Sequence, residues 1–174
     1  MIEVITSATT APGQKHAALA GHEGEIAVLG WPGQPPSPAT QTSGVVWRRA
    51  VEWIPYQKST FVTPAFPAFI SGHSTFSRSA AEVLSRFTGS PYFPGGLGEF
   101  RAPRNAFLRF ERGPSDDVAL QWASYADAAD EAGISRLWGG IHVRSDDFAG
   151  RRMGAQIGPA AFAKAERYFD GTAP

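Results

Sequence analysis

Prolines and glycines set the strongest limit on how this chain can fold. Its 174 residues include 14 prolines and 19 glycines. Each proline lacks a backbone N–H and fixes φ, so it interrupts helices and central strands. Residues 31–38 read Trp-Pro-Gly-Gln-Pro-Pro-Ser-Pro and must form a loop, while the prolines within residues 60–70 require an extended segment. Regular structure is therefore confined to the intervals between these breakers.

The clearest helical interval is residues 75–87. Apolar side chains recur there at helical spacing, Ser74 can cap the N-terminus, and Gly89 supplies the stop. The positions expected to form the apolar face are Phe76, Ala80, Val83, Leu84 and Phe87.

Three further intervals favour helices. One covers residues 124–133 and ends at Gly133. A long helix is expected over residues 145–168, with a kink at Gly158–Pro159. A shorter helix is predicted between residues 45 and 54, where Pro55 ends it.

The pattern for β-structure is weaker. In residues 107–112 and in residues 118–122, side chains of different polarity or size alternate along the chain. The two segments flank Gly113–Pro114, which predicts a small hairpin. Residues 1–44 are loop-rich, and residues 25–29 within them are either a brief strand or the end of a helix.

These elements predict a mainly α-helical fold, a helical bundle with long Pro/Gly loops and one small β-hairpin. A chain of 174 residues suits a single domain with a buried core. Within it, residues 1–44 form a lead-in and residues 45–168 form the helical core that carries the motifs described next.

Composition excludes several classes of function. The formal net charge is zero, which argues against binding nucleic acid or an anionic membrane through bulk charge. The absence of cysteine excludes disulfides and thiolate chemistry. No run of 18 apolar residues is present, and residues 1–6 lack the features of a signal peptide. We expect a soluble protein with no nucleic-acid or membrane partner, in a compartment that the sequence does not identify.

One short stretch, residues 135–146, places a guanidinium, an imidazole and a carboxylate at set spacings. The planar fork of Arg136 suits two oxygens of an anion at once. Asp146 follows His142 by one helical turn, so its carboxylate can hold the imidazole in one tautomer. Alone, a His–Asp pair of this spacing is more often part of a solvated helix face.

A second stretch, Ser71-Gly72-His73, precedes the helix predicted over residues 75–87. A helix N-terminus offers backbone N–H groups to an anion, and Gly72 lets the backbone approach closely. The Ser71 hydroxyl adds a donor, and His73, which has no built-in carboxylate partner, suits proton transfer. Alone this triplet is more often an ordinary turn, but the two stretches in this order predict an oxyanion pocket.

The two stretches resemble a known family. Ser135-Arg136-x5-His142-x3-Asp146 fits, without a gap, the last signature of the vanadium-dependent haloperoxidase and type 2 phosphatidic acid phosphatase superfamily. Pro67-x2-Ile70-Ser71-Gly72-His73 resembles its middle Pro-Ser-Gly-His signature, with Ile70 where proline is usual. Residues 64–69 and 92–96 look like the soluble bacterial haloperoxidase branch, and the resemblance covers residues from about 45 to 165.

The resemblance implies a role for each matched residue. His142 would be the axial ligand of vanadate, or the nucleophile that attacks phosphorus in the phosphatases, and Asp146 would orient it. Arg136, Ser71 and the Gly72 N–H would bind the equatorial oxygens, and His73 would be the acid–base residue. Phe66 would lie in the halide pocket, where chloride-oxidising members are similar in carrying phenylalanine.

The implied reaction is oxidation of a halide by hydrogen peroxide at a His142-bound vanadate. The partners would be hydrogen peroxide and a halide or small organic substrate, and phosphate can occupy the same site. The runner-up is a phosphomonoesterase in which His142 attacks phosphorus and His73 protonates the leaving oxygen. The third reading is a truncated or non-catalytic module with an incomplete anion site.

The chain departs from the family at its first signature, Lys-x6-Arg-Pro. Its lysines are Lys15, Lys58 and Lys164, and none is followed by Arg-Pro at that spacing. Three explanations remain open: the basic arm lies in sequence that precedes this chain, Arg48, Arg49 or Lys58 replaces it, or the site is vestigial. The abrupt N-terminus favours the first, with an N-terminal remainder of the protein or a homo-oligomer as the expected partner.

Overall fold

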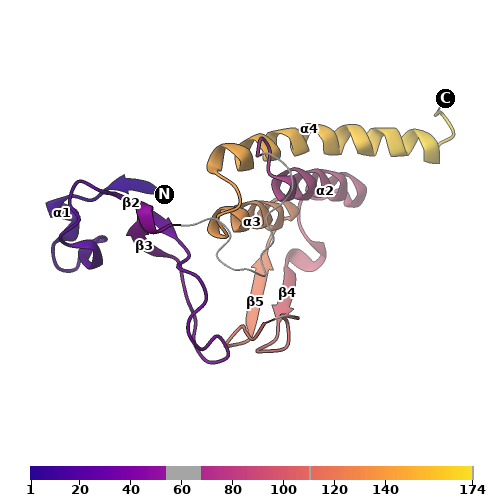
Figure 1. The fold of residues 1–174 in the computed structure, drawn as a ribbon. Coiled ribbons are helices and arrows are strands. Elements are labelled where there is room, and N and C mark those ends of the chain that lie inside the picture. The colour runs from indigo at the N-terminus through magenta and orange to yellow at the C-terminus, as the bar shows by residue number, and fades with distance from the viewer. Residues whose placement is uncertain (54–67, 110, 174) are drawn as a thin grey trace. The chain divides into compact units, whose positions relative to one another are not determined.

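The computed structural model describes residues 1–53, 68–109 and 111–173 (Figure 1). They divide into two compact units. The first unit comprises the described residues of Met1–Thr63, Arg104–Asp116 and Trp138–Ile141, and the second those of Pro64–Pro103, Asp117–Leu137 and His142–Pro174. The predicted mainly α-helical fold class is confirmed. The single domain expected over residues 1–174 stays a prediction.

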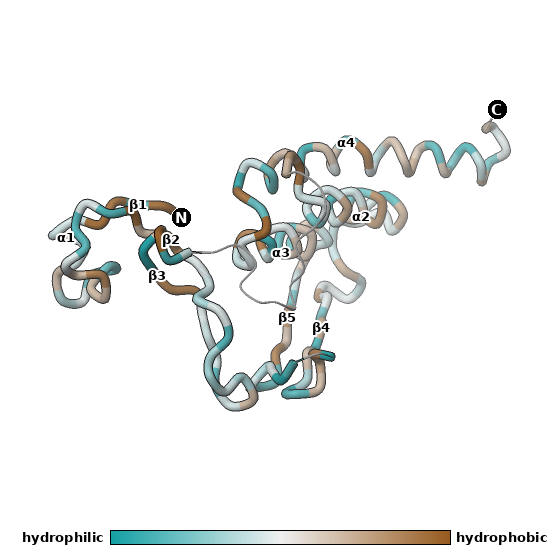
Figure 2. Tube along the Cα trace, viewed as in Figure 1, coloured by the Kyte–Doolittle hydropathy of each residue, from teal (hydrophilic) through white to brown (hydrophobic). Residues whose placement is uncertain are grey.

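The first unit is built on an antiparallel sheet of β1 (Ile2–Val4), β2 (Ile26–Gly30) and β3 (Val46–Arg49), in that order. The turns of α1 (Ser7–Thr10) and η1 (Ala17–Leu19) lie between β1 and β2 in the chain. Ile5, Leu19 and Ala27 form the buried core, against which Trp47 packs. Figure 2 shows apolar segments (brown) in these strands.

The helix predicted between residues 45 and 54 is wrong. Residues 46–49 form β3, paired with β2 in the register Leu29↔Trp47, and a single 3-10 turn, η2 (Ala50–Glu52), follows. Valine favours strands when a partner strand is available, and β2 supplies that partner. The strand alternative for residues 25–29 is confirmed by β2.

The second unit contains three helices, α2 (Gly72–Thr88), α3 (Tyr125–Trp138) and α4 (Arg144–Phe169), and a hairpin of β4 (Gly98–Ala102) and β5 (Val118–Trp122). The short η3 (Pro94–Gly96) precedes β4. Ala81, Tyr125 and Ala129 form its small apolar core, with Phe93 packed against it.

Helix α2 begins earlier than the sequence pattern indicated. Its N-cap is Ser71, whose Oγ accepts a hydrogen bond from the Ser74 N–H at 3.3 Å, so the prediction of Ser74 as N-cap is wrong. Both serines are fully buried. The stop at Gly89 is confirmed, because this glycine adopts the left-handed conformation that closes the helix.

The buried face of α2 also differs from the prediction. Phe76 and Phe87, expected on the core side, are each 78% exposed. The side of α2 that meets α4 carries small and polar residues instead, and three glycines of α4, Gly150, Gly154 and Gly158, lie against it. A Cβ added at Gly154 would stand 2.5 Å from the Thr75 carbonyl oxygen. This glycine row lets the two helix backbones approach closely.

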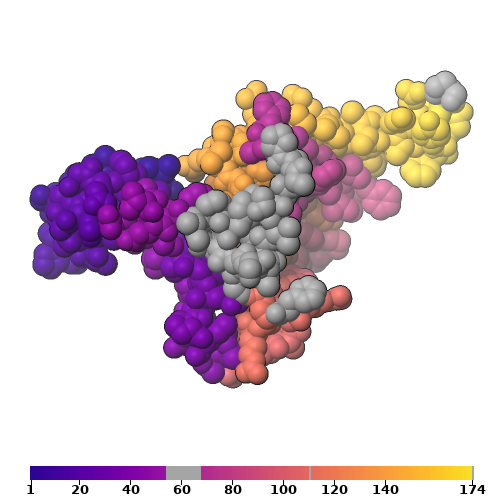
Figure 3. Space-filling view, in the orientation of Figure 1, coloured from indigo at the N-terminus to yellow at the C-terminus, as the bar shows by residue number. Residues whose placement is uncertain are grey.

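Helix α3 does not end at Gly133 as predicted but continues to Trp138. This glycine lies where another helix leaves no room for a side chain, since an added Cβ would be 2.5 Å from Asp147 Oδ1 and 2.8 Å from Ser74 Oγ. The long helix expected over residues 145–168 is confirmed by α4, which continues through Pro159. Figures 1 and 3 show its last turns (yellow) extending beyond the end of α2.

The predicted hairpin is half correct. Residues 118–122 do form a strand, β5, but its partner is β4, in the register Phe100↔Leu120, rather than residues 107–112. The connecting segment turns at Asn105, which has a φ of 54° and whose side-chain oxygen accepts a hydrogen bond from the Gly113 N–H. Apolar and polar residues also alternate over residues 98–102, so this segment suits a strand as well as residues 107–112 do. A longer connection allows it to pair with β5. None of the described helices is long and apolar enough to cross a membrane.

Candidate functional site

The Ser71-Gly72-His73 stretch forms the N-terminal end of α2 in the second unit. Ser71 is fully buried, and its N–H donates to the Asp146 carbonyl oxygen on α4 at 3.0 Å. A Cβ added at Gly72 would meet no described atom within 4 Å, so the space beside this backbone is open. At the N-terminus of this 17-residue helix, the backbone beside Gly72 therefore borders a space that no described residue fills, which suits an anion.

His142 and Asp146 form the expected pair. The His142 Nδ1 lies 3.2 Å from Asp146 Oδ2, and both side chains are buried. His142 precedes α4 by two residues, with Val143 as the N-cap, and Asp146 lies in the first turn. The carboxylate fixes the imidazole through Nδ1, which leaves Nε2 as the nitrogen that can meet a ligand.

Arg136 lies in the last turn of α3 and is half-buried. Its carbonyl oxygen accepts a long hydrogen bond, 3.5 Å, from the His142 N–H. The C-terminal turn is a favourable place for a cation, because the helix dipole is negative there. This backbone hydrogen bond therefore joins the two ends of the segment between Arg136 and His142.

His73 connects the two motifs electrostatically. Burial lowers the pKa of His73 below its ordinary value, and the electrostatic effects of Arg136 and then of His142 lower it further. Such an effect requires that the three side chains lie near one another. The structure therefore brings together His73 from one motif with Arg136 and His142 from the other.

A buried polar cluster, which the sequence patterns did not indicate, lies beneath these residues. The Ser74 hydroxyl donates to Asp147 Oδ1 at 2.6 Å, and Arg151 Nε donates to the same oxygen at 2.9 Å. Arg151 also pairs with Asp130 on α3 at 2.8 Å. The one feature of the sequence that could have indicated this cluster is Gly133. It lies inside α3, where residues with a side chain are usually preferred to glycine.

The candidates for a substitute basic arm have local partners. In the first unit, Arg49 pairs with Glu25 at 2.7 Å and with Glu52 at 3.3 Å. Arg48 donates to the Glu52 carbonyl oxygen at 2.7 Å. Lys58, and Phe66 as the candidate for the halide pocket, lie outside the described residues.

The side chains of the candidate site suit an oxyanion rather than a metal cation. Within residues 1–53, 68–109 and 111–173, no three His, Asp or Glu side chains gather as ligands for a metal cation. The residues that do gather are a carboxylate-held imidazole, a guanidinium, a helix N-terminus and a serine, and these are donors to an oxyanion. These donors fit vanadate or phosphate, because both groups present oxygens that accept hydrogen bonds. The imidazole of His142 also offers a nitrogen that could bind the central atom.

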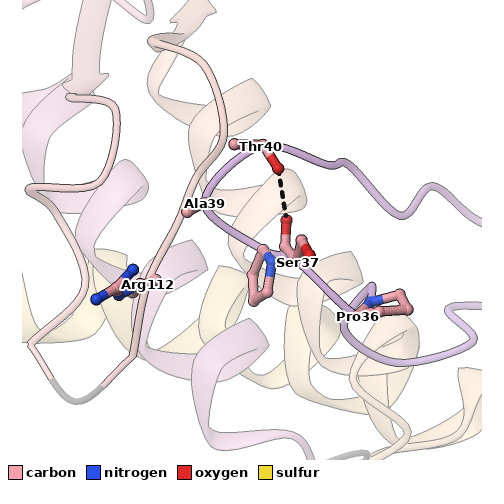
Figure 4. Close-up of a pocket in the computed structure, with 6 residues that line it drawn as sticks. Pro36, Ser37, Ala39, Thr40 and Arg112 are labelled. Atoms are coloured by element: carbon pink, nitrogen blue, oxygen red, sulfur yellow. Dashed lines mark hydrogen bonds between the residues drawn. The ribbon is translucent and has the colours of Figure 1, made fainter.

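Two cavities of the described residues lie away from these motifs. A pocket of about 480 Å³ in the first unit is lined by Pro36, Ser37, Pro38, Ala39, Thr40 and Arg112. Figure 4 shows the Ser37–Thr40 turn at its edge, closed by a hydrogen bond of 3.4 Å from the Thr40 hydroxyl. In the second unit an apolar groove of about 210 Å³ lies between α2 and α3. Neither contains a residue of the two motifs.

Comparisons with solved structures show where this fold occurs. A crystal structure of the holo form of a bacterial vanadium-dependent chloroperoxidase is 20% identical, with a TM-score of 0.61, over 81% of this chain and 27% of that one. The apo form is 20% identical, with a TM-score of 0.60, over 84% and 29%. A bacterial vanadium-dependent iodoperoxidase is 30% identical over 63% of this chain and 22% of that one, with a TM-score of 0.44. The chain thus spans less than a third of the length of these proteins.

A search of curated proteins found no match. The protein-family model of the VCPO second helical-bundle domain, however, matches residues 22–171, which is most of the chain. The matched region includes every motif residue described above. The chain therefore belongs to the vanadium-dependent haloperoxidase superfamily, as a relative of its second helical-bundle domain.

Proposed function

We propose that this chain carries the oxyanion site of a haloperoxidase-like enzyme, which oxidises a halide with hydrogen peroxide. The observation that carries the proposal is the contact between the two motifs: the Ser71 N–H at the start of α2 donates to the carbonyl oxygen of Asp146, whose side chain holds His142. Membership of the haloperoxidase superfamily and likeness to chloroperoxidase structures support it.

In the proposed site, His142 would hold vanadate through Nε2, because Asp146 engages Nδ1. Arg136, the Ser71 hydroxyl and the Gly72 N–H would bind its oxygens. When bound, vanadate supplies Lewis-acid activation of the peroxide without a change in its own oxidation state. Phosphate, with the same shape and charge, would compete for the same donors.

His73 is the proposed acid–base residue. Its lowered pKa favours the neutral ring near pH 7, and a neutral imidazole can accept a proton from hydrogen peroxide as the peroxide binds. Its side chain is exposed at the end of α2, where a proton can exchange with water. Asp146 would keep the tautomer of His142 fixed during these steps.

The missing Lys-x6-Arg-Pro signature predicts weak anion binding by this chain alone. Each charge-assisted hydrogen bond contributes roughly 1.5–3 kcal/mol, so the loss of two cationic donors would weaken affinity by about a hundredfold or more. Arg48 and Arg49 bind local acceptors in the first unit. We therefore expect a dissociation constant well above that of a site with a full basic arm.

The test is a calorimetric titration of the phosphate-free protein with orthovanadate. We expect one-to-one binding, lost in Arg136→Ala and His142→Ala, and peroxide-dependent bromination that depends on added vanadate. Arg101→Ala, which changes an exposed arginine of β4, is the matched control and should bind like the wild type. Absence of one-to-one binding by the folded wild-type chain would contradict the proposal.

A phosphomonoesterase would use the same residues, and the free Nε2 of a carboxylate-oriented His142 suits a nucleophile equally well. Hydrolysis of p-nitrophenyl phosphate without vanadate, abolished in His142→Ala, would favour that reaction. The chain spans less than a third of its solved relatives, which favours a third candidate, a module that binds an anion without turnover. Binding in the absence of both activities would identify it.

A further inference from the structure

The three helices of the second unit each supply a different part of the candidate site. Helix α2 begins with Gly72 and His73, α3 carries Arg136 in its last turn, and α4 carries Asp146 in its first. Anion binding through several donors requires their spacing to hold within a few tenths of an ångström. Something must therefore fix the three helix ends relative to one another.

One buried carboxylate, Asp147, contacts all three helices at this point. Its side chain is only 3% exposed, and its Oδ1 accepts hydrogen bonds from Ser74 on α2 at 2.6 Å and from Arg151 on α4 at 2.9 Å. Arg151 extends the connection to α3, where it pairs with the Asp130 carboxylate at 2.8 Å and donates to the Asp130 carbonyl oxygen at 3.1 Å.

Helix α3 also meets Asp147 directly. A Cβ at Gly133 would stand 2.5 Å from Asp147 Oδ1 and 2.8 Å from Ser74 Oγ, so only glycine leaves room for the Ser74–Asp147 hydrogen bond. Gly133 is three residues before Arg136, less than one helical turn. The contact therefore fixes α3 close to the residue that would bind the anion.

The position of Asp147 is also adjacent to the site on its own helix. It follows Asp146, whose side chain holds His142 and whose carbonyl oxygen accepts from the Ser71 N–H. Ser74, the partner of Asp147 on α2, donates its own N–H to Ser71 Oγ. The hydrogen bond from Ser74 to Asp147 is thus one step from Ser71, a residue proposed to bind the anion.

The charge of Asp147 argues against a direct role. A carboxylate near an anion site repels the ligand and weakens its binding, unless the carboxylate is compensated and serves another purpose. Arg151 compensates this charge, and Ser74 uses its acceptor capacity. We propose that Asp147 is a positioning residue, which locks the N-terminal turns of α2 and α4 and the last turns of α3 into the spacing that the anion requires. This inference rests on the proposed function.

Substitution separates positioning from charge because the two predict opposite signs. Asp147→Ala removes a negative charge, which by electrostatics alone would tighten anion binding. If Asp147 positions the donors, Asp147→Ala weakens orthovanadate binding by about 10–100-fold, as the loss of such supporting contacts usually does. Asp147→Asn keeps an oxygen that can accept from both Ser74 and Arg151, so its affinity stays within about fivefold of the wild type.

The matched control is Glu82→Ala. Glu82 is also a partly buried carboxylate of this helix pair, and it holds Arg78 and Arg86 on α2 at 2.7 Å each. It lies eight residues beyond Ser74, about 12 Å along the helix, so its loss should change vanadate affinity less than about twofold.

The experiment combines calorimetry with orthovanadate and amide hydrogen exchange on the full chain. In Asp147→Ala, but not in Glu82→Ala, the Ser71 and Ser74 amides should exchange at least about tenfold faster, because the turn that they close is no longer held. If Asp147→Ala does not fold, Ser74→Ala takes its place, because it leaves the Asp147–Arg151 pair intact. It should weaken vanadate binding and speed the exchange of these amides by about threefold each.

The two readouts distinguish this inference from the proposed function. Wild-type protein that binds no vanadate contradicts the proposed function, and hydrogen exchange alone then decides the positioning role. If the wild type binds, equal or tighter binding by Asp147→Ala overturns the inference. Unchanged exchange at Ser71 and Ser74 in a non-binding protein overturns it as well.

Discussion

The two histidines of the candidate site have unlike surroundings, and this difference assigns their proposed roles. His142 is buried and held by Asp146, which leaves it one nitrogen and one orientation. His73 lies at the N-terminal end of α2 with part of its ring open to water, and partial burial, Arg136 and His142 together lower its pKa. A fixed ring suits a ligand or nucleophile, and a neutral, water-accessible ring suits proton transfer.

The pKa of His73 should respond to anion binding. In the anion-free protein the neutral ring is favoured, so the contribution of His73 to stability is present at neutral pH and is lost as pH falls below the ordinary His value of 6.5 and through the lowered pKa of the folded state. A bound phosphate carries negative charge, favours the imidazolium and should raise the pKa of His73.

An NMR titration of the ring protons with and without phosphate measures this change. The His22 ring, which belongs to the first unit and lies beside Glu25, is the internal control and should not follow the phosphate concentration. A His73 pKa that phosphate leaves unchanged would mean that this ring does not face the anion.

At the scale of elements, the packing of α2 on α4 depends on a row of glycines rather than on an apolar seam. Gly150, Gly154 and Gly158 recur every four residues of α4, and at each an added Cβ would stand within 3 Å of α2 atoms. The side of α2 that they meet is polar and small, with the Ser79 hydroxyl donating to the Gly154 carbonyl oxygen at 3.3 Å. Close backbone approach and hydrogen bonds therefore hold this pair.

Gly154→Ala should lower the free energy of unfolding, although alanine favours helices. Helix propensity alone predicts a gain of about 1 kcal/mol, but the new methyl group would meet the Thr75 carbonyl oxygen, and overpacking costs about 1–3 kcal/mol. We expect a net loss in urea unfolding monitored by circular dichroism.

Ala160→Gly, at an exposed position of the same helix, provides the comparison. It should cost about 1 kcal/mol through propensity alone. A Gly154→Ala protein that is more stable than the wild type would show that α2 and α4 do not approach as closely as described.

At the scale of the whole molecule, the apolar side of α2 is not covered by the described residues. Phe76 and Phe87 are 78% exposed and Leu84 is 41% exposed, and they recur on one helix face. Exposed apolar patches of this kind usually mark a surface that another protein or subunit covers. The expected partner is therefore either another part of a longer protein or a second copy of this chain.

The purified chain should self-associate at micromolar concentrations through this face. Phe76→Glu combined with Phe87→Glu should shift it toward the monomer, because two charges would be buried in the contact. Light scattering after size-exclusion chromatography measures the mass. Phe169→Glu, which changes a phenylalanine that is 88% exposed at the end of α4, is the control. Equal association of the double variant and the wild type would exclude α2 as the contact.

Local patterns in the sequence predicted several elements of the fold and the superfamily. The stop at Gly89, the long helix α4 and the strand β5 each follow from the residues of their own segments. The motif spacings led to the correct superfamily, because a His–Asp pair one turn apart and a serine at a helix start are local arrangements. Local backbone preference and short-range hydrogen bonding explain these successes.

Only the tertiary structure decided which partners these elements have. The strand that pairs with β5, the strand character of residues 46–49, and the polar rather than apolar face of α2 that is buried all depend on residues distant in the chain. Gly133 has the sequence pattern of a helix stop, yet it lies within α3, where Asp147 and Ser74 need the space of its missing side chain. Close approach between helices and pairing between strands are long-range contacts, and no local propensity contains them.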